Sequence, residues 1–399
     1  MVKVWTLGCK LNQYDSARIN SLLAEVNKDI IILNTCAVTK NAEDEARKVL
    51  RKIKRENPQA IVVAFGCAVK ASKDEFEKMK EVDFCIESED ELLQKFSIKK
   101  RERVLPHFAN RTRPFLKIQE GCNGRCSYCI VPLLRGKSTS RDLDEILKEF
   151  REFLSCGFKE IVLTGTNLSE YGVDLKRMLN LIDVLKKLVE EEGDFRIRLS
   201  SLEPKILDEK FIDFLKENQH KICPHIHIPI QNGSEKVLKE MRRESDLEKI
   251  KNFILKIDEE IPFVAIGADI ICGYPTESEK DFEDSFNFLN SLPISFYHIF
   301  TYSPRKNTFS YNLKTIPDEV LSERKKLLLK LKEKKKIEFL KKNCGRKMRF
   351  ITLLPNKGYG RALSGNFIEV RTSKIYSPNE FRELKVELKE GNIPFGVED

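Results

Sequence analysis

The chain has 399 residues and a net charge of +9, from 71 Lys and Arg against 62 Asp and Glu. With 41% apolar residues it fits a globular protein of two or three domains that buries a sizeable core. The longest uncharged apolar run, Ala60 to Val69, is ten residues long, well below the ~18 that a membrane span needs. Its start in strand-like sequence, without a charged-then-apolar segment, predicts a cytoplasmic protein.

Eleven cysteines are too many to be incidental, and an odd number does not suggest a closed disulfide framework. In a chain without a signal segment they indicate a reducing compartment and metal or redox chemistry.

Residues 1–96 predict a small parallel α/β domain, because short β-branched runs alternate with polar helical stretches. These runs are Val2–Leu7, Ile30–Leu33 and Ala60–Phe65. A cysteine follows each run, at Cys9, Cys36 and Cys67. Loops after successive parallel strands emerge at one edge of a sheet. We therefore expect the three cysteines to converge there, although each alone could be a buried small residue.

Residues 97–113 read as a basic linker, with six Lys or Arg against one acid between 99 and 113. A second series of alternating strands and helices covers residues 114–323. Its predicted strands are Phe115–Gln119, Glu160–Thr164, Phe195–Ser200, His225–Ile228, Val264–Ile271 and Ser295–Phe300. Six such units favour a partial (β/α)6 barrel, whose chemistry lies at the C-terminal ends of the strands.

Residues 324–344 predict a long basic helix, and residues 324–349 hold thirteen Lys or Arg against two acids. Such clusters suit a polyanion, because Lys and Arg release counterions from phosphates, although a solvated Lys-rich helix face is an equal alternative. Residues 345–399 change to short β-rich stretches with Gly and Pro turns, which predict a small all-β barrel.

The sequence from Gly121 to Cys129 places Cys122, Cys126 and Cys129 in one loop after the first strand of the predicted barrel. Three thiolates spaced C-x3-C-x2-C can hold three corners of an iron–sulfur cube and leave the fourth iron open. Structural zinc prefers four ligands, and neither cysteine triad has an obvious fourth. A thioredoxin-like dithiol at Cys126 and Cys129 is disfavoured by the third cysteine.

This loop resembles the cluster loop of radical S-adenosylmethionine (SAM) enzymes. The preceding cysteine domain and the β-rich tail, which is similar to a TRAM domain, narrow the resemblance to methylthiotransferases. Four stretches resemble the tRNA N6-threonylcarbamoyladenosine branch: Thr6–Gln13, Asn34–Thr39, Leu116–Cys122 and Tyr302–Arg305.

The resemblance implies that Cys122, Cys126 and Cys129 hold a [4Fe-4S] cluster that binds and cleaves SAM to a 5′-deoxyadenosyl radical. It implies that Cys9, Cys36 and Cys67 hold a second [4Fe-4S] cluster that carries the sulfur to be inserted. A second SAM supplies the methyl group, and the target is C2 of threonylcarbamoyladenosine at tRNA position 37. The implied partners are tRNAs reading codons that begin with A and a flavodoxin or ferredoxin as electron donor, with a monomer favoured.

The resemblance also suggests cofactor contacts after the second, third and fourth barrel strands, at Gly165, Thr166, Ser200, Ser201, Glu203 and Gln231. Ser200 and Glu203 could equally cap a helix beginning near Pro204. Arg135 and Arg141 match family positions and could grip a cofactor carboxylate or an RNA phosphate, or be plain surface arginines.

Several residues depart from the pattern or have no role in it. Asn232 replaces a usual Ser and could reshape the cofactor pocket, and the tail is short for a TRAM barrel. His225 and His227 are expected on opposite faces of a strand, and neither is assigned as a ligand. The remaining cysteines are read as structural: Cys85, Cys156, Cys223, Cys272 and Cys344.

Rival hypotheses remain at the level of the sequence. A sister enzyme could act on isopentenyladenosine in tRNA or on an aspartate of a ribosomal protein, although the stretch Thr6–Gln13 argues against both. A non-catalytic RNA-binding protein with structural zinc or an electron-carrying cluster is a rival from another class.

Overall fold

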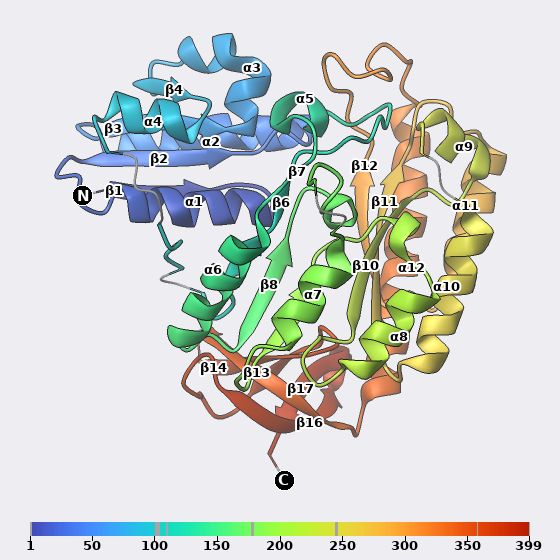
Figure 1. The fold of residues 1–399 in the computed structure, drawn as a ribbon. Helices are drawn as coiled ribbons and strands as arrows, with labels where there is room; N and C mark the ends of the chain where they lie inside the picture. Colours follow the sequence, from blue (N-terminus) through green and yellow to red (C-terminus); the bar gives the residue numbers. More distant parts are fainter. Residues whose placement is uncertain are drawn as a thin grey trace.

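The computed structural model describes residues 2–99, 104–108, 111–176, 179–243, 246–356 and 358–398. It has three parts: an N-terminal sheet, a central barrel of strands and helices, and a C-terminal barrel beneath it (Figure 1). Within the described residues, no helix has the length and apolar character to cross a membrane.

The N-terminal part is a parallel sheet in the order β1-β2-β3-β4. Its elements are β1 (Val2–Thr6), α1 (Lys10–Leu22), β2 (Ile30–Thr35), α2 (Lys40–Glu56), β3 (Ile61–Gly66), α3 (Cys67–Glu77), β4 (Phe84–Ile86) and α4 (Glu89–Lys95). The β2 and β3 strands are almost entirely buried because helices cover both faces of the sheet. The three-residue strand β4 was not predicted.

The central part is an open barrel of two three-stranded parallel sheets, β5-β8-β9 and β10-β11-β12. Single bridges from Ile197 to Ile222 and from Ser201 to His227 join the two sheets. The strands are β5 (Phe115–Lys117), β8 (Glu160–Thr164), β9 (Arg196–Leu199), β10 (His225–Gln231), β11 (Ala265–Cys272) and β12 (Phe296–Thr301), with a β6 (Gln119–Glu120) and β7 (Thr139–Ser140) ladder beside them. The partial barrel predicted from the sequence is confirmed.

Helices surround this barrel and bury their apolar faces against it. They are α5 (Val131–Arg135), α6 (Leu143–Ser155), η1 (Leu168–Glu170), α7 (Leu181–Val189), η2 (Pro204–Ile206), α8 (Glu209–Glu217), α9 (Glu235–Glu240), α10 (Leu247–Glu260), α11 (Glu279–Ser291) and α12 (Asp318–Asn343). The helix α12 begins six residues before the start predicted from its basic cluster.

The C-terminal part is a closed barrel in the order β13-β14-β15-β17-β16. Its elements are β13 (Lys347–Asn356), β14 (Tyr359–Ser364), β15 (Glu369–Thr372), β16 (Phe381–Lys389), η3 (Glu390–Asn392) and β17 (Ile393–Val397). The strand β17 was not predicted, and it closes the barrel by pairing with both β15 and β16. The tail is therefore long enough for a TRAM-like barrel.

A buried ion cluster joins the two barrels. Glu160 accepts from Arg113 (3.1 Å), Arg196 (2.7 Å) and Arg198 (2.7 Å). Arg196 and Arg198 also donate to backbone carbonyls of the C-terminal barrel, at Arg349 among others. Burial alone would raise the pKa of Glu160, but the three guanidinium charges outweigh it and hold that pKa below its usual range.

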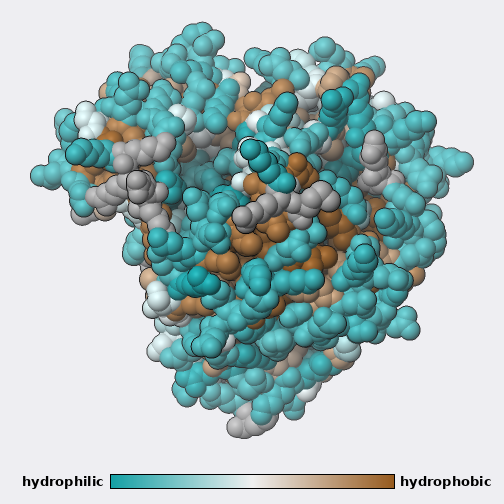
Figure 2. Space-filling model, in the orientation of Figure 1, coloured by the Kyte–Doolittle hydropathy of each residue, from teal (hydrophilic) through white to brown (hydrophobic). Residues whose placement is uncertain are grey.

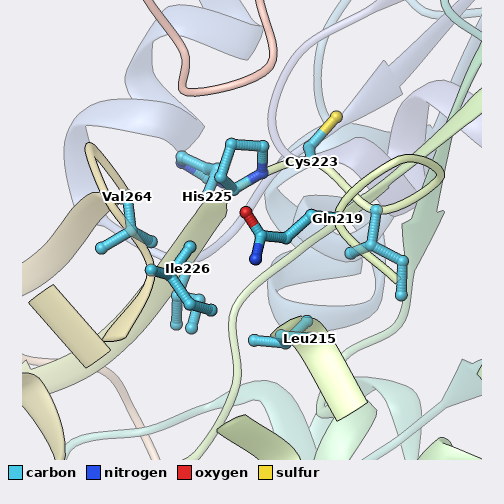
Figure 3. A pocket seen from close by; sticks show the side chains of 9 residues that line it. Leu215, Gln219, Cys223, His225, Ile226 and Val264 are labelled. Atoms are coloured by element: carbon cyan, nitrogen blue, oxygen red, sulfur yellow. The ribbon is translucent and has the colours of Figure 1, made fainter. Parts of the chain in front are cut away.

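The pocket at the base of β10 is too small for a substrate (Figure 3). It has a volume of about 10 Å³, enough for about one water molecule. His225 lines it, and its Nδ1 is buried without a hydrogen-bond partner in the described structure.

Figure 2 shows a mostly hydrophilic surface whose apolar patches gather across its middle, above the C-terminal barrel.

Candidate functional site

The N-terminal cysteines lie at one edge of the sheet, as the sequence predicts. Cys9 is the N-cap residue of α1, Cys36 follows β2, and Cys67 begins α3. Burial raises the pKa values of Cys36 and Cys67, and both thiols lie close enough to Cys9 for its charge to add to the shift. Gly8, with φ of +101°, allows this approach, because a Cβ there would lie 2.7 Å from the Cβ of Cys36.

Two buried asparagines behind these cysteines fix their loops. Asn12 donates from Nδ2 to the carbonyls of Leu7 and Thr35, both at 2.9 Å. Asn34 donates in turn to the Asn12 carbonyl (2.9 Å) and to Ser16 Oγ (3.0 Å). These bonds tie the loop after β1 to the loop after β2.

The second triad, Cys122, Cys126 and Cys129, lies in the loop between β6 and α5. Cys122 Sγ accepts from the Gly124 amide (3.3 Å) and from Asn167 Nδ2 (3.8 Å). Arg243 donates to Cys126 Sγ at 3.5 Å. Donors aimed at sulfur favour its anionic form, which is the form that binds metal.

Both triads fit a metal centre chemically. Burial raises the pKa of Cys129 to about 12, and it also raises the pKa values of Cys36, Cys67 and Cys122. These partly or fully buried groups are protonated thiols unless a cation replaces the proton. Two sets of three soft ligands, each in a loop at a strand end, match iron–sulfur ligation.

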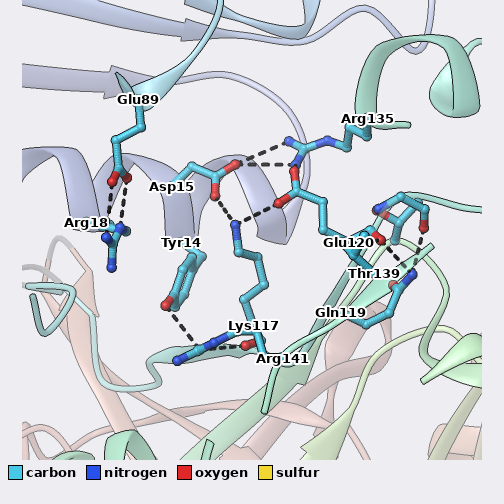
Figure 4. A network of polar contacts seen from close by, with 12 residues as sticks. Tyr14, Asp15, Arg18, Glu89, Lys117, Gln119, Glu120, Arg135, Thr139 and Arg141 are labelled. Carbon is cyan, nitrogen blue, oxygen red and sulfur yellow. Dashed lines mark hydrogen bonds and ion pairs between the residues drawn. The ribbon is translucent and has the colours of Figure 1, made fainter. Parts of the chain in front are cut away.

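A polar network crosses the boundary between the N-terminal sheet and the central barrel (Figure 4). Arg135 donates to Glu120 (2.7 Å) beside the second triad and to Asn12 (2.6 Å) and Asp15 (3.4 Å) on α1. Burial raises the pKa of the Cys67 thiol, and the nearby positive charge of Arg135 opposes that shift. Lys117 bridges Asp15 (2.8 Å) and Glu120 (3.0 Å) from below. Arg135 therefore contacts groups next to both triads at once.

Neither arginine considered for cofactor or RNA binding is free. Arg135 is committed to the network just described. Arg141 pairs with Glu149 (2.9 Å) and donates to the Lys117 carbonyl (2.7 Å) and to the hydroxyl of Tyr14 (3.3 Å). Both hold α1 against the barrel.

The opposite lip of the barrel also contacts the N-terminal sheet. Arg305, in the loop after β12, forms a buried ion pair with Glu43 on α2. Ser303 accepts from the Lys40 amide at 3.0 Å. The N-terminal sheet is thus anchored on both lips, and it brings Cys9, Cys36 and Cys67 over the barrel mouth.

The residues expected to contact a cofactor surround the mouth in three loops. Thr166 Oγ1 accepts from the Gly121 amide at 3.1 Å, so the loop after β8 supports the cysteine loop. Gly165 is required there, since a Cβ would lie 2.8 Å from Gln119 Oε1. Ser200 donates to the Leu163 carbonyl (2.6 Å), and Ser201 forms the bridge to His227.

The capping alternative for Glu203 is not what the structure shows. Its side chain pairs with Arg243 at 2.6 Å, and the short helix η2 has no side-chain cap. Arg243 therefore touches both Glu203 and Cys126, a role that nothing in the sequence signalled. Gln231 ends β10 with φ of +70°, at a register shift between β10 and β11.

Asn232 faces away from the strand ends. It is buried, donates to Glu277 (2.8 Å) and accepts from the Ser234 amide (2.9 Å). Its replacement of Ser therefore acts on the packing against α11 and α12.

Of the other cysteines, Cys223 and Cys272 are buried, Cys85 is half-buried, and Cys156 and Cys344 are exposed at helix ends.

The inner wall of the barrel is charged. His227 donates from Nε2 to Asp269 (2.8 Å), and His298 Nδ1 lies 3.3 Å from the same carboxylate. The expectation that His225 and His227 face opposite sides is wrong, because residues two apart on a strand face the same side.

Lys10 reaches this inner wall of the barrel from the N-terminal sheet, with Nζ 3.5 Å from Ser200 Oγ. Burial lowers its pKa to about 8, with Arg198 and Arg113 adding to the effect.

Comparison with known proteins fits this geometry. The radical SAM superfamily model matches residues 116–289, and the model of the uncharacterized protein family UPF0004 matches residues 1–87. Threonylcarbamoyladenosine tRNA methylthiotransferase MtaB of Aquifex aeolicus (strain VF5) is 35% identical over 92% of this chain and 95% of its own. The chain belongs to the radical SAM tRNA methylthiotransferases.

The names of the relatives in this methylthiotransferase family give more than one tRNA substrate. The Bacillus subtilis (strain 168) relative is also a threonylcarbamoyladenosine tRNA methylthiotransferase, 34% identical over 82% of this chain and 79% of its own. The tRNA-2-methylthio-N(6)-dimethylallyladenosine synthase of Clostridium tetani (strain Massachusetts / E88) is 32% identical over 82% and 80%. The family thus establishes a tRNA-modifying transferase that uses SAM and a [4Fe-4S] cluster.

Solved structures share the fold of this methylthiotransferase. The radical SAM methyltransferase TsrM from Kitasatospora setae superposes with a TM-score of 0.53 at 12% identity, covering 75% of this chain and 72% of its own. The cobalamin-dependent radical SAM enzyme OxsB gives 0.52 at 14% identity, covering 84% and 56%.

Proposed function

We propose that this enzyme converts N6-threonylcarbamoyladenosine at tRNA position 37 to its 2-methylthio derivative, with Cys122, Cys126 and Cys129 holding one [4Fe-4S] cluster. Cys9, Cys36 and Cys67 hold a second. The observation that carries the proposal is the pair of cysteine triads linked by Arg135. Insertion of sulfur and methyl into a C–H bond needs a radical-generating centre and a sulfur-carrying centre, and the chain offers two separate ligand sets for them.

The clusters supply the electron that cleaves SAM and the sulfur that is transferred. The protein's own part is positioning. The Arg135 network and the Arg305–Glu43 pair hold the two cysteine triads in a fixed position relative to each other. Arg243, beside Cys126, carries a positive charge that favours the thiolate and is itself oriented by Glu203.

SAM binds along the strand ends of the first sheet. Gly165, Thr166, Ser200, Ser201 and Glu203 follow β8 and β9, and Gln231 ends β10. Backbone groups exposed by Gly165 and hydroxyls from the serines offer the donors and acceptors that a ribose and an amino acid carboxylate require. The left-handed backbone of Gln231 turns the chain out of the strand at the mouth.

tRNA contacts come from the basic segments, with the target base unstacked into the barrel mouth. The helix α12 exposes lysines without an ion-pair partner among the described residues, at Lys325, Lys326, Lys330 and Lys341. Three basic residues of the linker, Lys100, Arg101 and Arg103, lie outside the described residues, and Arg113 is engaged by Glu160. The tRNAs are those reading codons that begin with A, and the electron donor is a cytoplasmic flavodoxin or ferredoxin.

The test uses anaerobically reconstituted enzyme, SAM, dithionite and two tRNAs, one carrying threonylcarbamoyladenosine and one carrying isopentenyladenosine. Mass spectrometry of digested nucleosides is expected to show 2-methylthio product from the first tRNA alone, together with 5′-deoxyadenosine. Product from isopentenyladenosine alone would assign the enzyme to the sister branch. SAM cleavage without product from either tRNA would contradict the proposal.

A further inference from the structure

Lys10 reaches from the edge that carries Cys9, Cys36 and Cys67 to the inner wall of the barrel. It follows Cys9 in the chain, and its ammonium extends to Ser200 at the end of β9, with the two atoms 3.5 Å apart. Within the part of the chain that the structure describes, no carboxylate lies within ion-pair distance of it. The positive charges of Arg198 and Arg113 and the negative charge of Asp269 all lie near enough to act on it.

The acid that faces Lys10 across the lumen is already engaged. Asp269 on β11 is held by His227 at 2.8 Å and by His298 at 3.3 Å. Gly267 leaves room for the first imidazole, because a Cβ there would lie 2.5 Å from His227 Nδ1. The imidazole of His298 is stacked on that of His227 with centroids 4.9 Å apart, and its side chain is 55% exposed.

Lys10 is half-buried and has no carboxylate in ion-pair contact among the described residues, so an anion that enters beside it is stabilised by its charge. The exposed imidazole of His298 lies on the same wall as Asp269. A lumen lined in this way suits a small carboxylate with hydrogen-bonding neighbours. It does not suit a branched hydrocarbon, which would leave the Lys10 ammonium without a counter-ion.

We propose that Lys10, assisted by His298, forms the subsite that binds the carboxylate of the substrate's amino-acid-derived side chain and thereby selects threonylcarbamoyladenosine over adenosines with an apolar side chain. The inference rests on the proposed function. The threonylcarbamoyl group carries a carboxylate and a hydroxyl, whereas the isopentenyl group carries neither. A site that pairs a buried charge rejects the analogue lacking it far more strongly than an apolar pocket rejects a polar one.

The position of Lys10 explains how selection and chemistry are linked. The base that reacts has to lie between the two triads. Lys10 is one residue from Cys9 and touches Ser200 on the SAM side, so a substrate held by its carboxylate at Lys10 lies between them.

The test measures the Kd of the reconstituted enzyme for anticodon stem-loop RNAs that carry threonylcarbamoyladenosine or its methyl ester, whose carboxylate is neutral. We expect wild type to bind the acid about 10- to 100-fold more tightly than the ester, the range of one buried charge pair. Lys10→Met is expected to bind the acid as weakly as wild type binds the ester, with no further loss for the ester. Lys10→Arg, which keeps the charge, is expected to retain most of the preference.

Controls separate this role from a structural one. Lys3→Met removes an exposed lysine of the same sheet and should leave the preference unchanged. His298→Ala removes an exposed side chain and should reduce the preference about three- to tenfold. Iron content should stay at the wild-type level in Lys10→Met.

Three results have distinct meanings. Loss of iron in both Lys10→Met and Lys10→Arg would show that Lys10 supports the cysteine edge and would overturn the inference. An unchanged preference for the acid in Lys10→Met would overturn it as well. If wild type modifies isopentenyladenosine and not threonylcarbamoyladenosine, the proposed function itself has failed.

Discussion

The two cysteine triads are built in opposite ways. Cys122, Cys126 and Cys129 lie within one loop, whereas Cys9, Cys36 and Cys67 come from three loops that only the parallel sheet brings together. The first triad is local and is recognisable from its spacing alone. The second depends on the register of three strands and on the Asn12 and Asn34 hydrogen bonds behind them. Removing a thiol from each should therefore separate two functions.

The largest expected effect comes from one thiol of each triad. Cys126→Ala should abolish both 5′-deoxyadenosine formation and methylthiolation, each by about 1,000-fold or more. Cys9→Ala should abolish methylthiolation to the same extent and leave 5′-deoxyadenosine formation intact. Both products are quantified by chromatography and mass spectrometry from one reaction.

The control for both variants is Cys156→Ala, an exposed cysteine at the end of α6, which should change neither product. Equal loss of SAM cleavage in the Cys9 and Cys126 variants would mean that the two triads do not act separately.

Arg135→Met should break the connection between the triads. The substitution leaves Asp15 and Glu120 without their shared guanidinium and should lower the free energy of unfolding by about 3 kcal/mol. We also expect SAM cleavage that no longer leads to product. Arg151→Met, which removes an exposed pair with Glu191, should cost less than about 1 kcal/mol. Equal denaturation midpoints for the two variants would argue against the network.

Glu160→Gln should weaken the other domain junction, where the C-terminal barrel meets the central one, in a pH-dependent way. The pKa of Glu160 is held below its usual value, so its ionised form stabilises the fold above a pH of about 4.3, and this stabilisation is lost as the pH falls. The difference in unfolding free energy between wild type and Glu160→Gln should be constant near neutrality and shrink in acid. A difference that grows in acid would contradict this account.

The smallest effect concerns tRNA. Replacing Lys326 and Lys330 on α12 with Ala should lower the slope of log Kd against log salt by about 0.9 for each tRNA phosphate that these lysines neutralise in the wild type. The same pair of changes at Lys48 and Lys52 on α2 is the matched control and should leave the slope unchanged. Equal slopes for both double variants would favour the alternative that α12 presents only a solvated face.

The difference between the triads also explains what sequence reasoning found and missed. The triad within one loop was predicted from its spacing. The triad from three loops was predicted because its cysteines follow successive strands, and parallel sheets align their strand ends. Arg243 was missed because it meets Cys126 across 117 residues, without a local signal. The strands β4 and β17 were missed because one has three residues and the other follows a turn-rich stretch.

The remaining errors concern which residues contact one another in the fold, and the position of a residue in the sequence does not reveal this. Arg135 and Arg141 were singled out because they match family positions, yet the carboxylates that hold them, Glu120, Asp15 and Glu149, lie on other elements. The charged lumen wall was missed for the same reason, since its histidines and Asp269 come from three different strands. Side-chain register on β10 was misjudged, although a period of two residues was enough to correct it.

The most direct test of two separate metal centres is the iron and acid-labile sulfide content per chain after anaerobic reconstitution, in wild type and in Cys9→Ala. The account predicts about eight irons and eight sulfides in wild type and about four of each in the variant, because each triad holds one four-iron cube. About four irons in both proteins, or zinc in place of iron at the N-terminal edge, would contradict it.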